Sequence, residues 1–159
     1  PMYIRLSRDV LPAVYGAEQK FETGKGIILR EGSDATIIAC GLMVSQALKA
    51  ASILAREGLS VRVVDMFCIK PLDQELIIES AFKTGAIVSA EEHNIIGGLG
   101  GAVAEVLASS GVGAVQRFVG VKDLHGESGP YRKLLTKYGL DVPSLVRAVK
   151  EAVEKKLKL

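Results

Sequence analysis

The sequence has no tryptophan, few aromatic residues, two cysteines and no marked excess of charge of either sign. Lys and Arg total 20 against 18 Asp and Glu, a net charge of +2, which argues against nucleic acid or an anionic membrane as the main partner. Aromatic residues are 5% of the chain, too few for a base-stacking surface. No apolar run approaches the ~18 residues of a membrane span, and no signal-peptide pattern opens the chain.

The scarcity of cysteine and histidine excludes further classes. Cys40 and Cys68 lie in apolar runs, which favours free thiols in a reducing cytoplasm over a disulfide framework. With His93 and His125 as the two histidines and no C-x-x-C, the chain lacks the ligand spacing of a metal site. Residues 126–129 lack the second spacer of the G-x-S-x-G nucleophile motif. The sequence therefore predicts a cytoplasmic protein without a disulfide framework, a metal site or a G-x-S-x-G nucleophile.

Regular apolar patterning is what the sequence does contain. With 159 residues, 48% of them apolar, the chain suits one main domain. From residue 25 on, apolar strand patterns alternate with amphipathic helix patterns, as in βαβ units. The predicted strands are 26–30, 35–40, 61–66, 86–90 and 115–121. The predicted helices begin near 43 and 73, within the glycine run at 97–101, and near 131 and 143. Because right-handed crossovers put helices on both faces of a parallel sheet, we expect a three-layer α/β domain over residues 25–159.

The first residues follow a different pattern. Residues 2–8 alternate between apolar and polar positions, which is typical of a strand. Residues 9–24 contain Pro12, Gly16 and Gly24 with little periodicity, which indicates a linker. The chain begins at Pro1, inside the strand pattern, so we expect a fragment of a longer polypeptide.

A glycine run marks one candidate site at the carboxyl ends of the strands, where ligands bind in open α/β sheets. It is a poor dinucleotide motif, because Val103 stands where the third glycine should be. A helix that begins here could hold a phosphate or carboxylate on its free N–H groups. Alternatively, the glycines let the helix approach the sheet closely. The candidate anion-binding residues are Gly97, Gly98, Gly100 and Gly101.

Charged residues supply two more candidates. Glu91 and Glu92 are neighbours, so in a strand they point to opposite faces and make a poor acid–base pair. His93 beside them is able to carry a proton, but the alternative for all three residues is a subunit or domain interface. Near the N-terminus, Arg5 and Arg8 offer the guanidinium forks that suit phosphate groups.

Several stretches of the chain resemble the transketolase family. Residues 4–12 are similar to the end of its pyrimidine-binding domain. Residues 61–73 fit V-x-V-[VL]-D-x-x-x-[IV]-K-P-L-D, and residues 91–103 fit E-[ED]-H-x-x-x-G-G-[LIF]-G-x-[AG]-V, both from its C-terminal domain. Residues 126–129 and 137–140 are similar to the tail of that domain. The resemblance covers essentially the whole chain.

The resemblance implies a fold and a division of the chain. The family's C-terminal domain has a mixed five-stranded sheet between helices, with the first strand antiparallel. Residues 1–24 would then be the end of the pyrimidine-binding domain and a linker, and residues 25–159 the C-terminal domain. The arginine of the family's L-S-R segment contacts the sugar phosphate and corresponds to Arg8. Glu91, Glu92 and His93 would lie at an assembly contact, and no catalytic residue can be placed in this chain.

The resemblance also implies an activity for the complete enzyme. Transketolases of the pentose phosphate pathway move a two-carbon ketol unit between sugar phosphates as dimers, using thiamine diphosphate held with Mg²⁺. The cofactor-binding domains lie upstream, in the same chain or in an N-terminal subunit. We therefore expect this chain to bind neither thiamine diphosphate nor Mg²⁺ alone, and to be inactive alone.

Three rival interpretations stay open. Deoxyxylulose-phosphate synthase and the β subunit of 2-oxo-acid dehydrogenases have similar C-terminal domains and share the cofactor. Residues 5–8, Arg-Leu-Ser-Arg, weigh against both. The third is a non-catalytic anion-sensing module that uses the glycine run.

Overall fold

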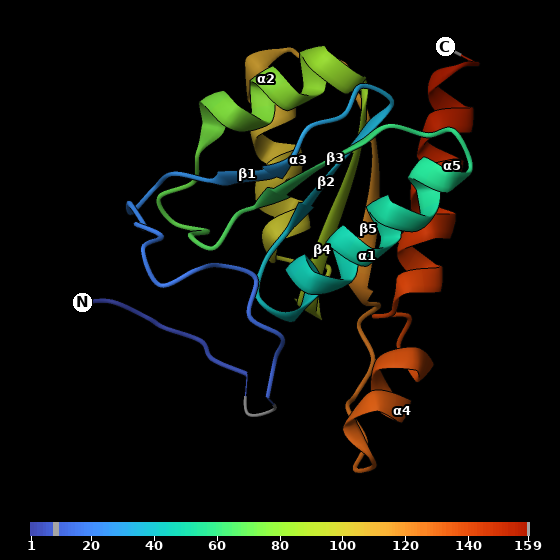
Figure 1. The fold of residues 1–159 in the computed structure, drawn as a ribbon. Helices are drawn as coiled ribbons and strands as arrows, with labels where there is room; N and C mark the ends of the chain where they lie inside the picture. Colours follow the sequence, from blue (N-terminus) through green and yellow to red (C-terminus); the bar gives the residue numbers. More distant parts are fainter. Residues whose placement is uncertain (8–9, 159) are drawn as a thin grey trace.

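A computed structural model describes residues 1–7 and 10–158 of the chain. A mixed sheet lies between two layers of helices (Figure 1). The strands are β1 (Ile27–Arg30), β2 (Ala35–Ala39), β3 (Val61–Asp65), β4 (Ala86–Asn94) and β5 (Val115–Val121). The helices are α1 (Leu42–Arg56), α2 (Gln74–Thr84), α3 (Leu99–Ser110), α4 (Tyr131–Lys137) and α5 (Val142–Lys156). None of the helices in these described residues is long and apolar enough to cross a membrane.

The sheet has the order β1-β3-β2-β4-β5. β2, β3, β4 and β5 pair in parallel, whereas β1 runs antiparallel to β3, with Ile27 opposite Asp65. This arrangement confirms the three-layer α/β fold and the antiparallel first strand. Because β1 is antiparallel, its amino end lies beside the carboxyl ends of the other strands.

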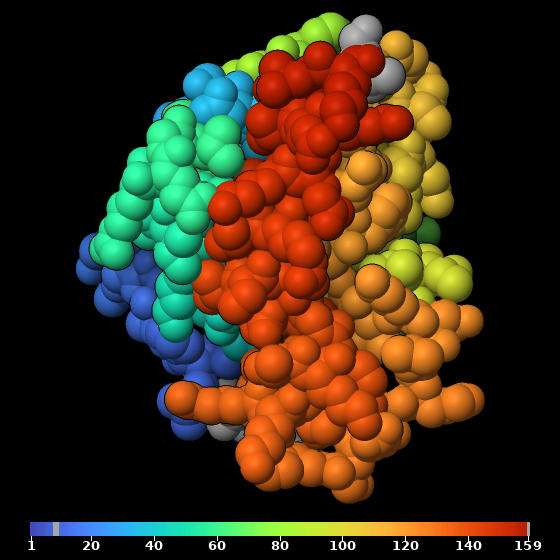
Figure 2. Space-filling model, turned by 90° about the vertical axis from the view of Figure 1, so that its right-hand side faces the viewer, coloured from blue at the N-terminus to red at the C-terminus, as the bar shows by residue number. Residues whose placement is uncertain are grey.

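Helices cover both faces of the sheet, as the alternation predicts. α1 and α5 pack on one face, where Leu54 and Val149 join the buried side chains of β2 and β4. α2 and α3 pack on the other face through residues such as Ile77 and Val103. Figure 2 shows α5 running down the middle of the first face, with α1 beside it and α4 at its lower end.

Local signals place the helix ends. Asp73 caps α2, accepting a hydrogen bond from the Leu76 N–H at 3.2 Å, and α2 ends at Gly85 in the left-handed conformation. α5 begins after Asp141, whose side chain caps it. At the other end of α5, the Lys156 ammonium donates to the Asp34 carbonyl at 2.8 Å and the Thr84 carbonyl at 2.9 Å. α5 therefore finishes at the amino end of the sheet.

The structure corrects two expectations about strands. The predicted strand at 2–8 is absent from residues 2–7, which are exposed and have no neighbouring strand to form a ladder. β4 is longer than the predicted 86–90 and continues to Asn94, because its last residue pairs with Val121 of β5 after a register shift. This extension carries the acidic residues to the carboxyl end of the sheet, where Glu91 is still buried and Glu92 is partly exposed.

Candidate functional site

The carboxyl ends of the parallel strands meet at one end of the sheet. β3 ends at Asp65, Cys40 follows β2, and β4 ends with the acidic stretch from Glu91 to Asn94. The N-terminal segment and α4 lie at the same end, toward the bottom of Figure 1. The structure thus brings together most of the chemistry-bearing residues that the sequence singles out.

Glu91 is buried at the start of α3. Its side chain is 2% exposed, and its two carboxylate oxygens accept hydrogen bonds from the Leu99 N–H at 2.7 Å and the Gly100 N–H at 2.9 Å. These amides have no partner within the helix, and the helix dipole favours a negative charge beside them. Glu91 is therefore the internal cap of α3.

The glycine run fits around this cap. A Cβ at Gly98 would overlap the Glu91 carboxylate, and a Cβ at Gly100 would lie 2.7 Å from the Ser89 hydroxyl and overlap the Phe118 ring. These contacts confirm the expectation that the glycines let α3 approach the sheet closely. An external anion at Gly97–Gly101 would have to displace a buried carboxylate, so the anion site gains no support from this geometry.

Glu92 and His93 face away from the core. The Glu92 carboxylate accepts a hydrogen bond from the Tyr131 hydroxyl at 3.0 Å, and its backbone carbonyl accepts one from the Arg5 guanidinium. The His93 side chain is 51% exposed, and its Nδ1 lies 3.9 Å from a Glu91 oxygen. Glu91 and Glu92 thus have different surroundings, as their adjacent positions in a strand predict. Their place at an interface stays a prediction.

Asp65 and Cys40 are further titratable groups at this end. Asp65 is buried and accepts a hydrogen bond from the Tyr15 hydroxyl at 2.6 Å. Burial raises the pKa of the Asp65 carboxyl, although the Tyr15 hydrogen bond opposes the shift. Burial, and then the nearby Glu91 and Asp65 carboxylates, raise the pKa of the Cys40 thiol from 9.0 to about 12.

Cys40 should therefore react slowly with alkylating reagents. At pH 8 a thiol with this raised pKa is almost wholly protonated, and the thiolate is the nucleophile. We expect iodoacetamide to modify Cys40 in the folded chain at least ~100-fold more slowly than in urea. Mass spectrometry of timed samples would measure both rates. Equal rates would contradict the raised pKa of the Cys40 thiol in the folded chain.

The sugar-phosphate residue implied by the family resemblance, Arg8, lies outside the described residues. Within residues 1–7 and 10–158, no group of three or more His, Cys, Asp or Glu side chains could hold a metal ion. Tyr15 and Tyr131, which donate hydrogen bonds to Asp65 and Glu92 at this end of the sheet, were not predicted from the sequence. Each is a lone tyrosine in a loop or helix start, and only the fold brings it to its acidic partner.

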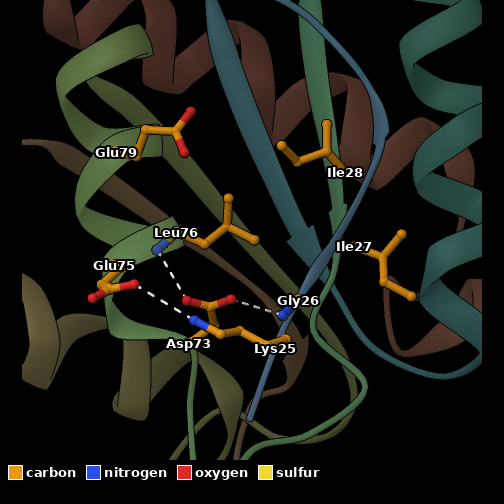
Figure 3. Close-up of a pocket in the computed structure, with 8 residues that line it drawn as sticks. All are labelled: Lys25, Gly26, Ile27, Ile28, Asp73, Glu75, Leu76 and Glu79. Carbon is orange, nitrogen blue, oxygen red and sulfur yellow. Dashed lines mark hydrogen bonds and ion pairs between the residues drawn. The ribbon is translucent and has the colours of Figure 1, made fainter. Parts of the chain in front are cut away.

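A groove lies elsewhere, between β1 and α2 (Figure 3). It encloses about 550 Å³. The Asp73 carboxylate within it accepts hydrogen bonds from the Leu76 and Gly26 N–H groups. Glu75 pairs with Lys25, and Glu79 pairs with Arg62. Since these charged groups bind one another, the groove offers no reason to assign a ligand. It is lined by Lys25, Gly26, Ile27, Ile28, Asp73, Glu75, Leu76 and Glu79.

Known proteins are similar to this chain in both sequence and fold. The family model described as "Transketolase, C-terminal domain" matches residues 24–145. A "Putative transketolase C-terminal section" of Methanocaldococcus jannaschii is 44% identical over 98% of this chain and 49% of its own length. The "6-deoxy-6-sulfo-D-fructose transketolase subunit SqwH" of a Clostridium species is 44% identical over 98% of this chain and 48% of its own length.

Two other matches place the chain in a wider group. A "1-deoxy-D-xylulose-5-phosphate synthase" of Syntrophotalea carbinolica is 46% identical over 80% of this chain and 20% of its own length. A solved structure titled "Split gene transketolase, inactive beta4 tetramer" is 50% identical with a TM-score of 0.89, covering 94% of this chain and 48% of that one. The chain spans about half the length of the transketolase relatives it matches. On this evidence the chain belongs to the transketolase C-terminal domain family.

Proposed function

We propose that this chain is the C-terminal part of a transketolase that transfers a two-carbon ketol unit between sugar phosphates. The observation that carries the proposal is the extent of the match: relatives named as transketolase sections or subunits align over 98% of the chain. Since the chain spans about half of those relatives, the complete enzyme needs an upstream section, which is the main partner. One of the relatives acts on a sulfo-sugar by name, so the sugar itself is not assigned.

A second candidate is the C-terminal part of a deoxyxylulose-phosphate synthase. A synthase relative has 46% identity, slightly above that of the transketolase sections, but aligns over only 80% of the chain. The greater extent of the transketolase match favours the first candidate. Both candidates imply thiamine diphosphate in the complete enzyme, so the acceptor substrate distinguishes them.

The cofactor belongs to the upstream section in this proposal. The described residues include no metal cluster, and Glu91 already occupies the first amides of α3, where a diphosphate would otherwise bind. These residues do not fit thiamine diphosphate with Mg²⁺, which in the complete enzyme supplies the carbanion chemistry.

The role of this chain is assembly and substrate anchoring. Glu92 and His93, which face outward beside the N-terminal segment, would contact the upstream section or a second copy in a dimer, while Glu91 holds α3 in place. Deletion of residues 25–159 from an otherwise intact enzyme should therefore abolish its assembly. An unchanged dimer after that deletion would contradict the assembly role.

A reconstitution assay tests the proposal. This chain and a thiamine-diphosphate-binding upstream section would be assayed separately and together for ketol transfer from xylulose 5-phosphate to ribose 5-phosphate, with pyruvate and glyceraldehyde 3-phosphate as the synthase pair. Activity with the first pair in the mixture alone supports the transketolase. Activity with the second pair alone would assign the synthase. No activity with either pair, from a partner that binds cofactor, would contradict both.

Arg8 anchors the substrate phosphate in this proposal, as the family resemblance implies. A guanidinium held against a phosphate provides binding energy remote from the reacting carbons. We expect Arg8→Ala to lower kcat/KM for phosphorylated substrates by at least ~10-fold in the reconstituted enzyme. Arg56→Ala, at the exposed end of α1, is the matched control. An unchanged kcat/KM in Arg8→Ala would remove this role.

A further inference from the structure

Residues 10–24 lie against the carboxyl end of the sheet although they form no helix or strand. Their backbone hydrogen bonds are local turns, such as Gln19 N–H to the Gly16 carbonyl at 3.2 Å. A segment without ladder or helix bonds depends on its side chains for a fixed position.

Asp65 provides the first attachment. It is 5% exposed, and its Oδ2 accepts the hydrogen bond from Tyr15 at 2.6 Å. Its Oδ1 is buried without a hydrogen-bond partner among the described residues. A buried carboxylate is costly unless donors satisfy it. Tyr15 brings a donor from outside the sheet, so the end of β3 and the segment depend on each other.

Aromatic contacts give a second attachment to the same connection. The Tyr15 ring packs edge-on against Phe21, and Phe21 packs edge-on against Phe67, with 5.0 Å between ring centroids in each pair. Phe67 follows Asp65 by two positions in the chain. Downstream, Gly26 N–H donates to Asp73 at 3.0 Å, as Figure 3 shows. The connection between β3 and α2 thus holds the segment at several points.

We propose that Tyr15 and Asp65 are positioning residues, whose hydrogen bond fixes the path by which the upstream section enters this domain. The effect of this hydrogen bond on activity rests on the proposed function, whereas its effect on the position of residues 10–24 does not. Upstream of the segment, the Arg5 guanidinium donates to the Glu92 carbonyl, so the chain stays along the same end of the sheet. A change at Tyr15 should therefore alter where the upstream section lies relative to this domain.

Tryptic cleavage of this chain alone tests the attachment. Lys20 is an exposed site inside the segment, and cleavage after it reports local opening. Tyr15→Phe keeps the ring contacts and removes the hydroxyl, so we expect cleavage at Lys20 to become about tenfold faster. Tyr3→Phe, which removes a hydroxyl from a residue 88% exposed, is the matched control and should leave the rate unchanged.

Asp65→Asn tests the same hydrogen bond from the side of its acceptor. Its amide oxygen still accepts from Tyr15, so its cleavage rate should lie between those of the wild type and Tyr15→Phe. In the double variant the two effects should not multiply, because both substitutions act on the same hydrogen bond, which Asp65→Asn weakens and Tyr15→Phe removes. Circular dichroism confirms that each variant is folded. A wild-type cleavage rate in Tyr15→Phe, or multiplied effects in the double variant, would overturn the attachment.

The reconstituted enzyme tests the positioning role. We expect Tyr15→Phe to lower kcat/KM for the sugar phosphates about tenfold through a higher KM, with cofactor binding by the upstream section unchanged. Asp65→Asn should retain more activity than Tyr15→Phe. If the wild-type mixture is inactive, the proposed function fails while the cleavage result stands. Faster cleavage with wild-type kinetics in an active mixture would overturn the positioning role.

Discussion

Glu91→Ala is expected to destabilise the folded chain by about 4 kcal/mol, since it removes two hydrogen bonds to a charged acceptor, each worth roughly 1.5–3 kcal/mol. The substitution would leave the Leu99 and Gly100 amides buried without a partner, at the end of a helix whose dipole favours a negative charge. A loss of this size is a large part of the ~5–15 kcal/mol that stabilises a typical domain. Urea unfolding followed by circular dichroism would measure it.

Two further variants separate the cap from other effects. Glu91→Gln has nearly the same shape but turns one acceptor into a donor, so we expect it to lose about half as much stability. Glu92→Gln changes the neighbouring, outward-facing carboxylate, which makes one hydrogen bond to Tyr131, and should lose no more than ~1 kcal/mol. If Glu91→Ala were as stable as Glu92→Gln, the capping role would be wrong.

Gly98→Ala is expected to cost about 3 kcal/mol for a steric reason that acts on the same cap. The backbone at Gly98 has a φ of −99°, which any residue adopts, so backbone strain does not contribute. The added methyl group would overlap the Glu91 carboxylate and lie 2.8 Å from the Asn94 carbonyl. The carboxylate would have to leave the amides of α3. Unfolding in urea measures this loss as well.

Gly101→Ala is the matched control, because the same change occurs three residues away, within α3. A Cβ there meets nothing within 4 Å, and alanine is the better helix former by about 1 kcal/mol, so this variant should be slightly more stable than the wild type. In a Glu91→Ala background the cost of Gly98→Ala should fall, because only the close contact with the Asn94 carbonyl remains. Additive costs of Glu91→Ala and Gly98→Ala would show that the methyl group and the cap act separately.

The sequence predicted the features that depend on neighbouring residues. The cap at Asp73 and the glycine at position 85 mark the ends of α2, and the near-continuous apolar runs predict buried parallel strands. The helix bounds shift by about one residue, as expected for frayed ends. The family motifs predicted the antiparallel first strand, which no periodicity could have shown.

The site itself depended on contacts between distant positions. Glu91 meets the start of α3 only because the chain turns back after Asn94, and the missing Cβ at Gly98 was the one local sign of this contact. Tyr15 and Asp65 are fifty positions apart, and no sequence pattern joins them. The strand at 2–8 was predicted from alternation alone, which describes the side chains of a strand but not the partner that it needs.

The direction of β1 has a practical consequence for anyone who attaches a label to this protein. Because this short strand runs against its neighbour, the preceding residues arrive at the end of the sheet that holds Asp65 and Glu91. α5 finishes at the opposite end of the sheet (Figure 1). There the Lys156 side chain donates to the carbonyls of Asp34 and Thr84, which lie just ahead of β2 and β4. A fluorescent protein fused after α5 would therefore lie away from Asp65 and Glu91, whereas one fused ahead of residue 1 would lie at the same end of the sheet as these two carboxylates.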